Sequence, residues 1–188
     1  MATAANFDLF TKYWKSLQAE ADGPLPARSQ FDPSKMAVLL PYVYLLEHKS
    51  REEMIVRLMG TALDEISAVP ATGLNYFDIC PPEDVALYIE INKHLHALPC
   101  ASLVERDITF ENGKTYALSS LGYPMTDATG DLAFSIGLML PSRQVQADDM
   151  DNGGVARSIL RKLTFIDIGF GVPDRQAINH HAVEAALD

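Results

Sequence analysis

Apolar residues near the N-terminus recur at the spacing of a helix. Phe7, Phe10, Trp14 and Leu17 are three or four residues apart, and this predicts an amphipathic helix that ends before Gly23. The stripe needs cover, because a continuous apolar patch of this kind is uncommon on the surface of a monomer. The cover is either the chain's own sheet or a second copy of the chain.

After residue 41 the pattern changes to strands. Apolar or alternating runs at 42–46, 54–59, 102–110, 114–123 and 132–140 predict five strands. Polar turns separate most of them, and Asn112-Gly113 is a strong signal for a two-residue hairpin. Consecutive strands joined by short turns favour antiparallel pairing.

Two helices are predicted between the second and third strands. The first is short, at 61–68, and the second begins at Pro81-Pro82 and continues to Leu98. We therefore predict an α+β fold, a five-stranded antiparallel sheet with helices on one face. An N-terminal helical extension (1–40) precedes this core (41–141), and a linker with a C-terminal extension (142–188) follows, including a final helix from Pro173 or Asp174.

Composition and charge narrow the possible partners. The chain has 188 residues with 48% hydrophobic content and a net charge of −10, which opposes non-specific attraction to nucleic acid or anionic lipid. The two cysteines form no metal-type pair and no disulfide framework, which favours a reducing compartment. The N-terminus lacks the pattern of a signal peptide, and no apolar run is long enough for a membrane helix. We expect a cytoplasmic protein.

Three phrases of the sequence are similar to a known family. They are Leu40-Pro41-Tyr42-Val43-Tyr44-Leu45-Leu46-Glu47, Arg57-Leu58-Met59-Gly60-Thr61-Ala62-Leu63 and Gly122-Tyr123-Pro124-Met125-Thr126-Asp127. In this order they resemble a PAS-like family of small alphaproteobacterial proteins, over about residues 6–141. The resemblance implies a PAS fold and a role in sensing or protein interaction, without catalysis.

A ligand pocket, if one is present, is expected between the sheet and the helix of residues 83–98. Its helix wall would be Leu87, Tyr88, Ile91 and Leu95, and its sheet wall would come from among Tyr44, Arg57, Arg106 and Tyr116. Mostly apolar walls with few polar groups are typical of small-molecule sites. Each arginine in a strand needs a partner if it is buried, either a carboxylate of the protein or a bound anion. The alternative is that these side chains fill the core completely.

Candidate residues for cofactor chemistry are few. Cys80 is near the position of the flavin-reactive cysteine of photoreceptor PAS domains, but its context, Asp78-Ile79-Cys80-Pro81, does not match that subfamily. His94 borders the apolar stripe of its helix, where it could be an axial ligand of a haem, yet an edge or surface histidine is the simpler interpretation. The identity of any cofactor stays open, and no metal site or catalytic set is predicted.

The favoured function is a stand-alone PAS-type regulatory module for signal transduction that binds a small ligand or a protein partner. The alternatives are an interaction adaptor with a filled core, and a small α+β pocket enzyme of the isomerase or dehydratase type. Because the chain has no output domain of its own, we expect a homodimer through Phe7, Phe10, Trp14 and Leu17. Small residues on the last strand, Ala133, Ser135 and Gly137, would admit Trp14 closely if that helix packs within the chain.

Overall fold

The computed structural model describes residues 2–67, 70–141 and 155–174. Its helices are α1 (Ala2–Ala19), α2 (Thr61–Ser67), α3 (Tyr76–Ile79) and α4 (Pro82–Ala97), with short 3-10 helices at Arg28–Gln30, Pro33–Met36 and Leu40–Tyr42. Its strands are β1 (Val43–Ser50), β2 (Glu53–Met59), β3 (Ala101–Phe110), β4 (Thr115–Thr126), β5 (Leu132–Pro141) and β6 (Val155–Ile166). The final helix expected from Pro173 or Asp174 and the linker of residues 148–154 lie outside the described residues.

One antiparallel sheet contains all six strands in the order β2-β1-β5-β4-β3-β6. The five predicted strands and their antiparallel pairing are confirmed. The hairpin at Asn112-Gly113 is present, but its loop has three residues (111–113) and not the two expected, because Thr109 pairs with Thr115 and the amide of Phe110 donates to the carbonyl of Lys114; Gly113 ends this loop with a positive φ of 82°. The sixth strand is a difference from the prediction, which treated residues 142–188 as an extension. Its alternation is broken at Arg161, which is the extra residue of a β-bulge because Lys162 pairs with Glu105 and Leu160 pairs with Arg106.

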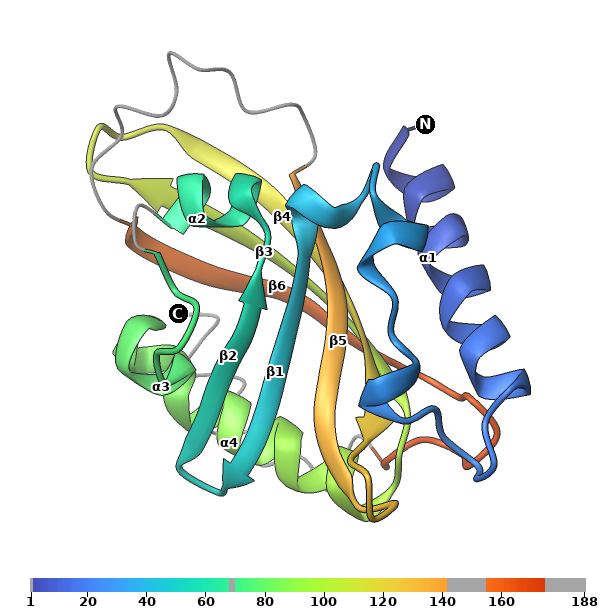
Figure 1. The fold of residues 1–188 in the computed structure, drawn as a ribbon. Helices are drawn as coiled ribbons and strands as arrows, with labels where there is room; N and C mark the ends of the chain where they lie inside the picture. Colours follow the sequence, from blue (N-terminus) through green and yellow to red (C-terminus); the bar gives the residue numbers. More distant parts are fainter. Residues whose placement is uncertain (1, 68–69, 142–154, 175–188) are drawn as a thin grey trace.

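Helices lie on both faces of the sheet (Figure 1). α2, α3 and α4 lie on one face, whereas α1 lies on the other. Alternation along β5 explains the division: Ile136 and Leu138 face the α1 side and are buried with it, while Gly137 faces the α4 side. The N-terminal helix thus completes a third layer of the fold.

The apolar stripe of α1 is covered by the chain itself. Phe10, Trp14 and Leu17 are at most 4% exposed within one chain, while Phe7 is half-buried. The indole of Trp14 stacks on Tyr123 at 4.6 Å between ring centres, and its Nε1 donates to the carbonyl of Pro124 at 3.2 Å. Of the two covers expected for the stripe, the chain's own sheet is the one observed within a single chain, and the homodimer through this stripe stays a prediction.

The small residues of β5 admit a different aromatic ring from the one expected. Trp14 packs on the opposite face, and the side chain that lies against Gly137 is Tyr44 of β1. None of the helices within the described ranges is long and apolar enough to cross a membrane.

Candidate functional site: a cavity between the sheet and α4

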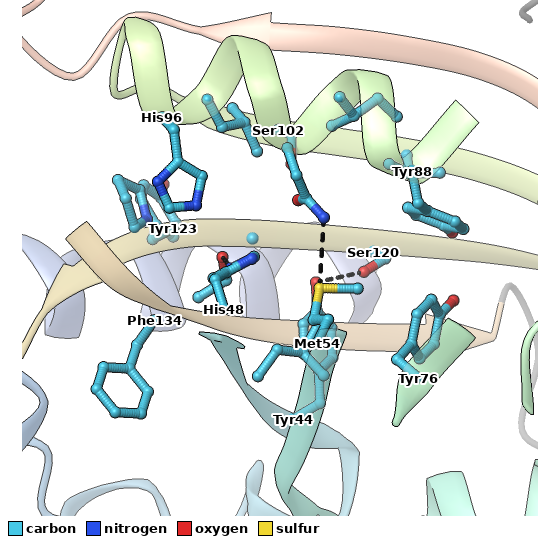
Figure 2. Close-up of a pocket in the computed structure, with 18 of the residues that line it drawn as sticks. Tyr44, His48, Met54, Tyr76, Tyr88, His96, Ser102, Ser120, Tyr123 and Phe134 are labelled. Atoms are coloured by element: carbon cyan, nitrogen blue, oxygen red, sulfur yellow. Dashed lines mark hydrogen bonds between the residues drawn. The ribbon is translucent and has the colours of Figure 1, made fainter. Parts of the chain in front are cut away.

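A cavity of about 90 Å³ lies between the sheet and α4 (Figure 2). A water molecule needs roughly 10–15 Å³ on this measure, so the space accommodates a small organic molecule or several waters. Much of its wall is apolar and includes Leu46, Met54 and Met59 from the sheet and Ile91 and Leu95 from α4. No Asp, Glu, Lys or Arg side chain is among the described residues that line it.

Tyr44 crosses the sheet side of the cavity over two glycines. Gly137 pairs with Tyr44 on one side and with Gly122 on the other, so the ring runs from β1 across β5 toward β4. An added Cβ at Gly137 would overlap the ring at Cζ and Cε1, and one at Gly122 would lie 3.1 Å from its hydroxyl. The hydroxyl is 3.0 Å from Oγ of Ser120. Burial raises the pKa of Tyr44 to about 12, so it is a neutral hydrogen-bonding group.

Two histidines face each other at one end of the cavity, as Figure 2 shows. The rings of His48 on β1 and His96 on α4 are 5.1 Å apart and nearly perpendicular. Nε2 of His48 is 2.7 Å from Oγ of Ser135. Burial, with a smaller contribution from His96, lowers the pKa of His48 to about 4, and burial also lowers the pKa of His96. Both imidazoles are therefore neutral at physiological pH.

Two tyrosines form the opposite end of the cavity. Tyr76 from α3 and Tyr88 from α4 meet edge to face at 5.3 Å between ring centres (Figure 2). Burial raises the pKa of Tyr76 well above its ordinary value. Behind Tyr88, outside the cavity wall, Nη2 of Arg106 donates to the Tyr88 hydroxyl. This end offers hydroxyl groups without an exposed charge.

The eight predicted ligand-binding residues divide into three groups. Tyr44, Tyr88, Ile91 and Leu95 line the cavity. Leu87, Arg106 and Tyr116 are buried but stand outside its wall: Leu87 packs with Leu160, and Tyr116 belongs to the cluster under α2. Arg57 is the remaining residue, and its predicted place is wrong.

Arg57 is exposed on the sheet edge. Leu45 pairs with Leu58 and Leu46 with Val56, so Arg57 is the extra residue of a β-bulge. Its side chain is 44% exposed and its Nε donates to Glu47, which also pairs with Lys49. Alternation from the buried residues Met54 and Val56 gives the same outward position for Arg57, and the bulge then returns Met59 to the cavity side.

Several cavity residues were not predicted from the sequence. His48 could have been found, because positions 44, 46 and 48 alternate onto one face of β1. Ser120 and Ser135 carry no chemical signal, and Tyr76 and His96 reach the cavity only through the placement of α3 and α4.

The two residues considered for cofactor chemistry lie outside the cavity wall. Cys80 is buried at the end of α3, and Nε2 of His94 is 3.3 Å from Glu90 on the same helix. Cys100 does line the cavity, and burial raises its pKa to about 11, so it is a neutral thiol. In the described part of the chain, no three His, Cys, Asp or Glu side chains are grouped so that they could bind a metal ion.

The fold and the family agree. A family model described as PAS domain matches residues 1–140, and the chain belongs to this family. β6 lies beyond the matched residues. A comparison with curated proteins finds no sequence match.

Among solved structures, the chain is similar to the Vibrio cholerae VqmA dimer (12% identity, TM-score 0.46), covering 60% of this chain and 52% of that one. It is also similar to the PAS domain of Bordetella pertussis BvgS (18% identity, TM-score 0.37; 60% and 86% covered). A third is the Rhodobacter sphaeroides LOV protein (12% identity, TM-score 0.41; 64% and 73% covered). The chain spans about half the length of the VqmA chain.

Proposed function

We propose that this chain is a PAS-type sensory module whose cavity binds a small uncharged molecule, and that it acts through a protein partner rather than by catalysis. The observation that carries the proposal is the cavity itself, which has a largely apolar wall and polar groups at both ends. The hydroxyls of Tyr76 and Tyr88 lie at one end and the imidazoles of His48 and His96 at the other, with the Tyr44 hydroxyl and Ser120 between them.

The uncharged side chains of the cavity wall indicate a ligand without net charge. An ion placed in this cavity would lose its hydration without meeting an opposite charge, which is costly. The guanidinium of Arg106 lies against the cavity residue Tyr88, and Asp84 already neutralises it at 2.7 Å. A neutral molecule with one or two hydrogen-bonding groups therefore fits better than an anion or a cation.

Native mass spectrometry of the full chain purified from cells tests the proposal. We expect a bound mass on the wild-type protein. Ser102→Leu, which places a branched side chain in the cavity, should remove that mass. Ser119→Leu is the matched control, because Ser119 precedes the cavity residue Ser120 on β4 and itself lies outside the wall.

Two results would count against ligand binding. The first is a wild-type protein that carries no extra mass and binds none of a panel of neutral aromatic fragments. The second is a bound mass that Ser102→Leu and Ser119→Leu reduce equally, which would place the molecule elsewhere. Either result favours the alternative of an interaction adaptor.

A further inference from the structure

A buried arginine joins the cavity wall to the strand β6. Arg106 lies in the middle of β3 and is 8% exposed, and it contacts three other groups. Its Nη1 donates to Oδ2 of Asp84 at 2.7 Å and to Oγ of Ser158 at 2.8 Å, and its Nη2 donates to the Tyr88 hydroxyl. Asp84 and Tyr88 belong to α4, whereas Ser158 belongs to β6.

The contacts of Arg106 connect two parts of the molecule, the cavity side of α4 and the strand β6. Tyr88 lines the cavity with the side of its ring that meets Tyr76, and the Arg106 guanidinium lies 5.3 Å from the centre of the same ring. Ser158 is 5% exposed and points toward α4 from a strand that pairs only with β3. The side chains of Tyr88 and Arg106 therefore connect the cavity to Ser158 of β6.

The carboxylate of Asp84 is incompletely satisfied. Asp84 is fully buried, and its Oδ1 has no hydrogen-bond partner among the residues that the structure describes. A buried carboxylate oxygen without a donor is unfavourable, and a bidentate arginine–carboxylate pair is the stronger arrangement. A bidentate pair with Asp84 would require Nη2 to leave Tyr88 and take up Oδ1.

We propose that Tyr88 and Arg106 couple occupancy of the cavity to β6. A neutral molecule that hydrogen-bonds the Tyr88 hydroxyl competes with Arg106 for it, the guanidinium turns toward Oδ1 of Asp84, and its bond to Ser158 weakens. This regulation rests on the proposed ligand-binding function. It makes β6, which lies beyond the residues matched by the family, the part of the chain that responds to the ligand.

The coupling is testable without a ligand, by amide hydrogen exchange of the full chain. Tyr88→Phe keeps the ring but removes the hydroxyl that holds Nη2. We expect amide exchange in β6 to become about tenfold faster than in the wild type, which corresponds to one net hydrogen bond, while exchange in β5 is unchanged. Ser158→Ala should have the same effect, and the double variant should add nothing further, because both changes break one connection.

Tyr44→Phe is the matched control. It also removes one hydroxyl from the cavity wall, but that hydroxyl is bonded to Ser120 and not to Arg106. Exchange in β6 should then stay within about twofold of the wild type. The coupling is overturned if Tyr88→Phe leaves amide exchange in β6 unchanged or accelerates exchange in β5 equally. It is also overturned if Tyr44→Phe accelerates exchange in β6 as strongly, or if the effects of Tyr88→Phe and Ser158→Ala add in the double variant.

A second arm uses indole as the neutral probe. Indole bound to the wild type should accelerate exchange in β6, and it should produce no further change in Tyr88→Phe. Binding without a response of β6 overturns the coupling while the cavity function stands. If indole does not bind, that result counts against the proposed function, and the variant series alone decides the coupling.

Discussion

Replacing Gly137 by alanine tests how the sheet accommodates the Tyr44 ring. Gly137 lies in β5 between its partners Tyr44 on β1 and Gly122 on β4. The added Cβ would overlap Cζ and Cε1 of the Tyr44 ring, so the ring must leave its place on the cavity wall. Overpacking of a core costs about 1–3 kcal/mol. We expect Gly137→Ala to lower the free energy of unfolding by about 2 kcal/mol, or the melting temperature by about 4–8 °C.

Urea unfolding followed by circular dichroism measures this cost, and a second background separates the clash from other effects. Tyr44→Leu removes the atoms that the new Cβ would overlap, so Gly137→Ala on that background should cost less than about 0.5 kcal/mol. Gly23→Ala is the control, because no atom lies within 4 Å of its added Cβ. It should change stability by at most about 0.5 kcal/mol.

The reasoning is refuted if Gly137→Ala is neutral in the wild type, or if it costs the same in both backgrounds. In the first case the ring has another place of equal energy. In the second case the cost belongs to the strand and not to Tyr44.

Three further outcomes follow from the packing and charges. Trp14 is the only tryptophan, and its fluorescence should be weakly quenched by acrylamide at every protein concentration; quenching that increases on dilution would mean that a second copy covers α1. Arg106→Met should lower the free energy of unfolding in urea by about 3–5 kcal/mol, because it leaves Asp84 buried and unpaired. Adding Asp84→Leu to the same chain should restore most of this loss, and no recovery would contradict the pairing. His48 binds its proton more weakly in the folded state (pKa about 4) than in the unfolded state (about 6.5), so its contribution is complete above pH 6.5 and is lost as the pH falls toward 4. Unfolding free energy should therefore drop by about 2 kcal/mol from pH 7.5 to 5, and His48→Gln should remove most of that slope; an unchanged slope would show that other groups cause it.

Five strands and the antiparallel pairing of consecutive ones could be predicted from the residues, because these depend on local signals. Alternation, the hairpin position at Asn112-Gly113 and the Pro-rich start of α4 each act over a few residues, and they are found where expected, although the hairpin loop has three residues and not two. The pairing of β1 with β5 joins distant segments and was implied only by the family resemblance. The same signals indicated the helix face that borders the cavity, so Tyr88, Ile91 and Leu95 were found.

The sheet has two irregularities that the alternation pattern does not show. A β-bulge inserts one residue, Arg57 in β2 and Arg161 in β6, and reverses the face of the residues that follow, so Met59 returns to the cavity side and the pattern of β6 is interrupted. Bulges depend on how two distant strands fit together, and no residue type marks these two in the sequence.

Tertiary packing decided which face of the sheet α1 and the Tyr44 ring occupy. The sequence by itself determined that the stripe with Trp14 must be covered and that something must lie against the small residues of β5. It did not determine which aromatic ring packs on which face of the sheet, because either Trp14 or Tyr44 could be buried against those small residues. Tyr44 lies against Gly137 because the two residues are partners on adjacent strands, and α1 packs on the opposite face of the sheet. Cross-strand register depends on how two distant segments pair. The hydrophobic effect favours burial of apolar side chains without regard to direction, so the pattern of one strand does not show which residue of another strand it faces.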